Sequence, residues 1–246
     1  MKLLAFDTST ETLSIAVCDG ARQWTQDGAG GPQASMHLIP MLLALLDEAG
    51  LRLSALDAIV FGRGPGSFTG LRTACAVAQG LAFGASLPLL PVDTLLAVAE
   101  DARERHGAAR VHALLDARMG EIYLGDYAHD GERWRREGEI RLLRPQDFVP
   151  RPGWALAGNA FEACGDALPA DRPRLAALPT AAALLRVAPG LLALGAALAP
   201  EAALPLYIRD KVAKTSDERA AERAAREAAV HAAAPATVPD DAPPQR

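Results

Sequence analysis

The 246-residue sequence predicts an α/β protein built from two halves of similar design. Short apolar, strand-like runs alternate with longer helical segments, and this order occurs twice, before and after residue 106. A turn with four glycines and a proline, residues 61–73, follows a strand-like run and precedes a helical segment rich in small residues. Hydrophobic residues make up 50% of the chain, which is enough for a buried core.

Composition excludes several classes of protein. The net charge of -5 argues against a protein that coats nucleic acid by bulk electrostatics, although it leaves a local basic patch open. Cys18, Cys75 and Cys164 lie far apart and form no CxxC pair, so we expect neither a disulfide framework nor a thiolate metal site. The longest apolar stretch, residues 187–200, is interrupted by Pro189, Gly190 and Gly195 and is too short to span a membrane. We therefore expect a cytoplasmic protein with no membrane role.

The first half, residues 1–106, contains four expected strands and three expected helices. The expected strands are residues 3–7, 13–18, 57–60 and 87–92, and the expected helices are residues 36–49, 67–83 and 94–106. Ser35, Ser67 or Thr69, and Asp93 are the expected N-caps. Glycines follow the three helices at positions 50, 84 and 107 and are the expected stops.

The second half, residues 107–214, repeats the pattern. Its expected strands are residues 111–116, 121–129, 133–143 and 154–158, and its expected helices are residues 161–168 and 180–198, the latter broken near Pro189. Residues 215–246 are rich in Ala, Glu and Arg and then in Pro, and we expect them to be a disordered tail.

Two loops have the composition of phosphate-binding loops. Asp7, Thr8, Ser9 and Thr10 could hold a phosphate and its Mg²⁺ through one carboxylate, hydroxyls and backbone N–H groups. The second loop, with Gly64, Gly66 and Ser67, leads into a helix N-terminus, where unpaired N–H groups attract anions. Spacing alone leaves an alternative open for each loop. In the first, the Asp and Thr side chains only satisfy the backbone of their own turn, and the second is a structural turn with no ligand.

The first two expected helices are unusual. Helix 36–49 is apolar nearly all round, and helix 67–83 carries two faces of small residues. Either they present a surface to a partner, or they only pack on each other. We assign these residues to a partner interface: Met36, Leu38, Met41, Leu42, Leu45, Leu46, Gly70, Ala74, Val77 and Ala78.

Three separated motifs and a C-terminal signature occur in the sequence. They are residues 4–9 (LAFDTS), residues 64–72 (GPGSFTGLR), residues 116–123 (DARMGEIY) and the signature at 205–209 (PLYIR). Together they resemble the TsaB (formerly YeaZ) family over about residues 1–214. The resemblance implies the fold of the actin, hexokinase and Hsp70 superfamily, with two related domains, here 1–106 and 107–214, each a mixed sheet flanked by helices.

The resemblance also implies a function. TsaB is a subunit of the bacterial complex that places threonylcarbamoyl on N6 of adenosine 37 in tRNA. Its TsaD-type partner carries the metal and the catalysis, a TsaE-type ATPase completes the complex, and TsaB is the scaffold that TsaD requires. We therefore expect a subunit that pairs with a TsaD-type chain, or with a second copy when alone, and meets tRNA through the complex.

The sequence argues against chemistry in this chain itself. TsaD-like proteins hold their metal with a His-x-x-x-His pair, and residues 90–97 contain no histidine at the corresponding place. Ser9 stands where nucleotide-binding members of the superfamily have a glycine, and His37 is displaced from the family position. We expect no catalytic residue, metal or intrinsic cofactor, and two vestigial phosphate loops; ATP and metal would belong to the partner subunits. The alternatives are a sugar-kinase-like ATP-dependent enzyme and a metalloprotease-like protein of the same fold.

Overall fold

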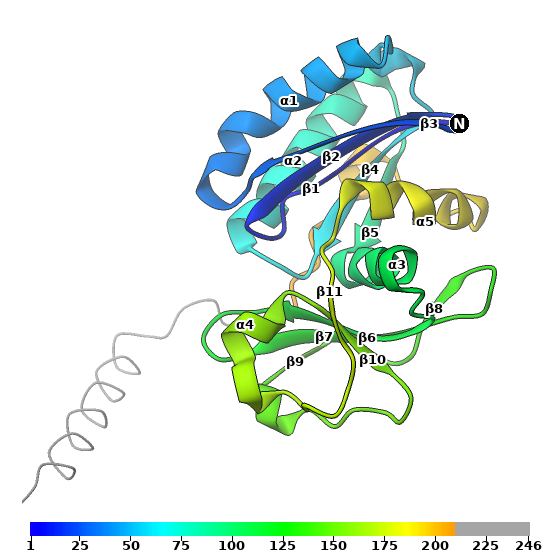
Figure 1. The fold of residues 1–246 in the computed structure, drawn as a ribbon. Helices are drawn as coiled ribbons and strands as arrows, with labels where there is room; N and C mark the ends of the chain where they lie inside the picture. The colour runs from blue at the N-terminus through cyan, green and yellow to red at the C-terminus, as the bar shows by residue number, and fades with distance from the viewer. Residues whose placement is uncertain (210–246) are drawn as a thin grey trace, which may run out of the picture. The chain divides into compact units, whose positions relative to one another are not determined.

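Five strands from the first half of the chain form one mixed sheet (Figure 1), in a computed structural model that describes residues 1–209. The strands are β1 (Lys2–Asp7), β2 (Thr12–Asp19), β3 (Arg22–Ala29), β4 (Ala58–Gly64) and β5 (Leu89–Asp93). Their order is β3-β2-β1-β4-β5, with β1, β2 and β3 antiparallel and β1, β4 and β5 parallel. The expected tail, residues 215–246, lies outside the described residues.

Helices cover both faces of this sheet. Because successive side chains of a strand point to opposite faces, Leu4 and Phe6 face one helix layer while Leu3 and Ala5 face the other. The first layer is α1 (Ala34–Glu48) with α2 (Phe68–Ala85), which lie against each other. The second layer is α3 (Thr94–His106) with α5 (Ala181–Ala193), so the late helix α5 packs on the early sheet.

The second sheet is also mixed. Its strands are β6 (Arg110–Asp116), β7 (Ile122–His129), β8 (Trp134–Arg136), β9 (Arg141–Leu143), β10 (Ala155–Gly158) and β11 (Arg174–Ala176). The order is β11-β10-β6-β7-β8, with β9 also paired to β7. The short helix α4 (Ala160–Cys164) covers one face, and α3 covers the other.

Helix α3 therefore lies between the two sheets, and eight of its residues are buried. Among them, Glu100 accepts hydrogen bonds from Arg103, from Arg186 of α5 and from the Trp134 indole of β8. Burial raises the pKa of Glu100, but these bonds outweigh it and hold the pKa below its usual range. Glu100 thus connects elements of both halves of the chain.

Several expected elements differ from the observed ones. Residues 22–29, which belong to none of the expected elements, form the edge strand β3. Residues 133–143 form two short strands, because Gly138 between them has a φ of +94° that an extended strand does not allow. Helix α1 begins at Ala34 with Gln33 as its N-cap, not at Met36 with Ser35 as the cap.

The expected helix ends differ as well. Helix α2 continues past Gly84 to Ala85. Helix α5 is not broken at Pro189 and continues to Ala193, although the proline has no N–H to donate to the carbonyl of Leu185. Helix α4 is confined to Ala160–Cys164 and is followed by a short 3₁₀ turn. Helix α3 has the expected bounds, and Gly107 ends it in the left-handed conformation.

All strands of the first sheet precede residue 106 and all strands of the second sheet follow it, whereas helix α5, from the second half of the chain, packs on the first sheet. The division into domains 1–106 and 107–214 stays a prediction. Within residues 1–209, no helix combines the length and the apolar character that crossing a membrane would require.

Candidate functional site

The two loops with phosphate-loop composition lie directly against each other. The backbone N–H of Ser67 donates to the carbonyl of Ser9 (2.7 Å), and the Thr8 hydroxyl donates to the carbonyl of Gly70 (2.7 Å). Ser67 is the N-cap of α2, and its hydroxyl accepts a hydrogen bond from the Gly70 N–H (3.5 Å). The structure thus brings the predicted residues of both loops together at one junction.

Glycines occupy this junction because the chain itself fills the space beside them. A Cβ on Gly66 would lie 2.6 Å from both the Cβ and the carbonyl oxygen of Ser9. A Cβ on Gly70 would collide with the carbonyl oxygen of Thr8, and a Cβ on Gly62 with the Asp7 carboxylate. The glycines of the turn at residues 61–73 therefore let the loop at residues 7–9 of this chain pack directly against the turn.

Asp7 is completely buried at the end of β1. The N–H and the hydroxyl of Ser9 both donate to Asp7 Oδ1 (2.8 and 2.6 Å), while Oδ2 has no hydrogen-bond partner among the described residues. Burial raises the pKa of Asp7 to about 6, although the Ser9 hydrogen bonds oppose the shift. Thr10 Oγ1 accepts from the N–H of Thr12 (3.2 Å). These contacts satisfy Asp7 Oδ1 and the Thr10 hydroxyl within the turn and leave the buried Asp7 Oδ2 unpaired.

A third loop reaches this region from the second sheet. Arg118, in the loop between β6 and β7, forms an ion pair with Glu11 of the first loop. Asp116 Oδ1 accepts from the Arg118 N–H (2.8 Å), and the Asn159 side chain accepts from the Asp116 N–H (3.0 Å). No role for this loop was predicted from the sequence, although residues 116–123 are one of the family motifs.

The partner interface predicted from the sequence stays a prediction, and most of its residues are buried within this chain. Seven of its residues lie inside this chain, where they contact the first sheet, the neighbouring helix or, for Gly70, Thr8; they are Leu38, Leu42, Leu45, Leu46, Gly70, Ala74 and Ala78. Met41 and Val77 are half-buried, and Met36 is 65% exposed. The alternative reading, packing of the two helices within this chain, accounts for the seven buried positions, so a partner could reach only their exposed neighbours.

The outer faces of α1 and α2 remain apolar nonetheless. Ile39 and Leu43 of α1 are 43% and 52% exposed, and Phe83 of α2 is 80% exposed. Gly80 and Gly84 flank Phe83, and no described residue lies within 4 Å of a Cβ placed on either. We call these five residues with Met36 the helix-pair surface. It combines projecting apolar side chains with open space of the kind that lets a second helix approach closely.

Among residues 1–209, no group of three or more His, Cys, Asp and Glu side chains is arranged to hold a metal ion.

Comparison with known proteins places the chain in a family. Residues 32–162 match the family model described as TsaD, tRNA N6-adenosine threonylcarbamoyltransferase. The chain is 35% identical to the Escherichia coli K12 tRNA threonylcarbamoyladenosine biosynthesis protein TsaB, over 87% of this chain and 96% of that protein. It is 38% identical to the Haemophilus influenzae protein of the same name, over 61% of this chain and 66% of that protein.

Solved structures agree. The structure described as YeaZ from Pseudomonas aeruginosa has a TM-score of 0.78 and 41% sequence identity, covering 84% of this chain and 99% of that one. A second Pseudomonas aeruginosa structure, described as an uncharacterized protein with similarity to peptidase YeaZ, has a TM-score of 0.79 and 40% identity, covering 85% and 99%. With the two mixed sheets flanked by helices, these matches confirm the expected fold class of the actin, hexokinase and Hsp70 superfamily. The chain therefore belongs to the TsaB (YeaZ) family.

Proposed function

We propose that this chain is a non-catalytic subunit of the complex that synthesises threonylcarbamoyladenosine in tRNA, and that a TsaD-type subunit performs the reaction. The pathway in this proposal is taken from its relatives, which are named as tRNA threonylcarbamoyladenosine biosynthesis proteins. The observation that carries the non-catalytic role is the junction of the two loops, where Ser9 lies against the glycine turn.

A phosphate cradle needs free backbone N–H groups and room for the anion. Here the Ser67 N–H already donates to Ser9, and the space beside Gly66 and Gly70 is taken by Ser9 and Thr8. Nucleotide binding would require these contacts to break. ATP and the catalytic metal therefore belong to the TsaE-type and TsaD-type partners in this proposal.

The helix-pair surface is the proposed scaffold contact. A TsaD-type partner has a related fold, so its own helix pair can pack against α1 and α2, and a second copy of this chain can take its place when the partner is absent. tRNA is reached through the assembled complex.

The deciding experiment is reconstitution of tRNA threonylcarbamoylation from the TsaD-type and TsaE-type partners, with and without this chain. We expect product only when the chain is present. Equal product formation without it would contradict the proposed function.

Titration of Mg-ATP into the purified chain tests the filled phosphate loops. We expect no saturable heat below millimolar nucleotide, because binding must first separate Ser9 from the glycine turn. The control is the same titration into the assembled complex, in which we expect saturable binding because the partner subunits contain the nucleotide site. Micromolar binding by the chain alone would favour the sugar-kinase-like alternative.

Charged substitutions test the helix-pair surface. We expect Leu43→Arg and Phe83→Asp each to weaken association with the partner, or with a second copy, by at least about 100-fold, because each would bury an unpaired charge in the interface. The matched control is Val149→Arg, since Val149 is also exposed (82%) but lies outside the helix pair. Circular dichroism should show all three variants folded. Unchanged co-purification of the two helix variants would contradict the assignment.

A further inference from the structure

We propose that a groove at one edge of the second sheet is a contact site for the sugar-phosphate backbone of RNA. This inference rests on the proposed function, because the tRNA-modifying complex is what brings RNA to this chain. It identifies a direct contact where the proposed function requires only an indirect one.

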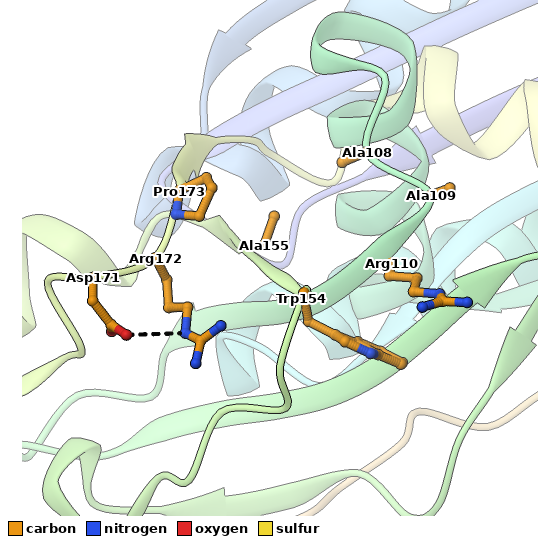
Figure 2. A pocket seen from close by; sticks show the side chains of 9 residues that line it. Ala108, Ala109, Arg110, Trp154, Ala155, Asp171, Arg172 and Pro173 are labelled. Atoms are coloured by element: carbon orange, nitrogen blue, oxygen red, sulfur yellow. Dashed lines mark ion pairs between the residues drawn. The ribbon is translucent and has the colours of Figure 1, made fainter.

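The groove is built where three neighbouring strands begin. Strands β6, β10 and β11 are parallel and adjacent, so their amino ends meet at the same edge of the sheet. The segments that enter them, residues 108–110, 153–155 and 171–173, line a cavity of about 410 Å³ (Figure 2). A second cavity of about 480 Å³ shares Arg110 and Trp154 with the first and continues past Arg135 and Arg151.

Hydrogen-bond donors without acceptors converge on this groove. Figure 2 shows Trp154 between Arg110 and Arg172, with all three side chains at the cavity. Within residues 1–209 neither the Arg110 guanidinium nor the Trp154 indole N–H forms a hydrogen bond or ion pair. Arg172 Nε lies 3.5 Å from Asp171, an ion pair without a hydrogen bond. The groove therefore suits a ligand that accepts hydrogen bonds and carries negative charge.

The charges favour a local contact. Three carboxylates line the two cavities, and each is paired with an arginine: Asp171 with Arg172, Asp130 with Arg135, and Glu137 with Arg151. Arg110 is then the one lining guanidinium without a counter-ion among the described residues. We expect one or two phosphate contacts here, which is compatible with the net charge of -5 for the whole chain.

The position of Trp154 is fixed by its neighbours. The Arg151 guanidinium lies 5.0 Å from the Trp154 ring, and the His112 ring lies 5.1 Å from it. His112 in turn is held by Asp126 (2.7 Å) and by the backbone N–H of Arg151 (3.0 Å). The Arg151 guanidinium and the His112 ring thus pack against Trp154, whose indole N–H has no acceptor among the described residues. We assign the groove to phosphate and sugar oxygens because its unpaired groups are hydrogen-bond donors.

The test measures binding of tRNA to the reconstituted complex at several salt concentrations. We expect Arg110→Ala to weaken binding about tenfold and to reduce the slope of log K against log salt by about one. Arg172→Ala should have a similar effect, and Arg110→Lys should retain most of the affinity because it keeps the charge. The matched control is Arg52→Ala, since Arg52 is an exposed arginine of the first half whose side chain has no ion pair within residues 1–209.

A second measurement locates the contact. Hydrogen exchange of the amides at residues 108–111 and 153–156 should slow when tRNA is added to the complex. The proposal would be overturned if complexes with Arg110→Ala or Arg172→Ala bound tRNA with the same affinity, and the same slope of log K against log salt, as the complex with the natural chain. That result would not affect the proposed function. Loss of partner co-purification in these variants with unchanged tRNA affinity would assign the groove to a protein and would also overturn it. The proposed function fails separately, if threonylcarbamoylation proceeds without this chain.

Discussion

Gly70→Ala should lower the free energy of unfolding by about 3 kcal/mol or more, because the added methyl group would collide with the backbone of Thr8. The Thr8 carbonyl cannot move aside alone, since the Thr8 hydroxyl is bonded to the Gly70 carbonyl and Ser9 to the Ser67 N–H. The substitution therefore separates the whole first loop from the start of α2. Urea unfolding of the full-length chain, at fixed protein concentration, measures the loss.

Gly190→Ala is the matched control for this prediction. Gly190 is also a helical glycine, in α5, but no described residue lies within 4 Å of a Cβ placed there. Alanine is the better helix former, so this variant should gain up to about 1 kcal/mol. Equal stability of Gly70→Ala and the natural chain would show that the two loops are not held together as described.

The sequence predicts an element well where local signals decide it. Helix α3 has the predicted bounds because Asp93 precedes it and Gly107 ends it. Strand β3 was missed because six of its eight residues are exposed, so its hydrophobic pattern does not alternate as that of a half-buried strand does. The packing of α5 on the first sheet depends on contacts between residues far apart in the chain, and an apolar stripe does not identify the surface that it will cover.

The candidate site was predicted only in part for the same reason, because its contacts join residues far apart in the sequence. The motifs and the serine at position 9 predict vestigial loops, and this stays a prediction. The close approach of Ser9 to Gly66 could not be predicted, because the two residues lie in loops far apart in the sequence. The interface residues were chosen by hydrophobicity, which selects buried positions such as Leu42 before exposed ones such as Leu43 when a helix is apolar all round. The groove at Arg110, Trp154 and Arg172 was not foreseen, because its residues come from the starts of three separate strands.

Asp7→Asn should remove a pH dependence of stability from the chain. The folded-state pKa of Asp7 is raised from 3.8 to about 6, so the folded protein holds this proton more tightly than the unfolded chain does. The stability from this proton is complete below pH 4 and is lost as the pH rises through 6, a difference of about 3 kcal/mol. We expect the free energy of unfolding of the natural chain to fall over this range and that of Asp7→Asn to fall less.

At pH 8 we therefore expect Asp7→Asn to be more stable than the natural chain by about 1 kcal/mol. An asparagine oxygen can still accept both Ser9 hydrogen bonds, and the loss of the buried charge outweighs the cost of an amide NH2 at the unpartnered Oδ2 position. Asp47→Asn, which neutralises an exposed carboxylate of α1, is the control and should follow the natural curve. The same variant separates the two readings of the loop. If Asp7 held the Mg²⁺ of a nucleotide, Asp7→Asn would abolish threonylcarbamoylation in the reconstituted complex. If the loop is vestigial, the Asp7→Asn variant is both more stable and active. In that case the Asp7 carboxylate lowers the stability of the folded chain and takes no part in the reaction.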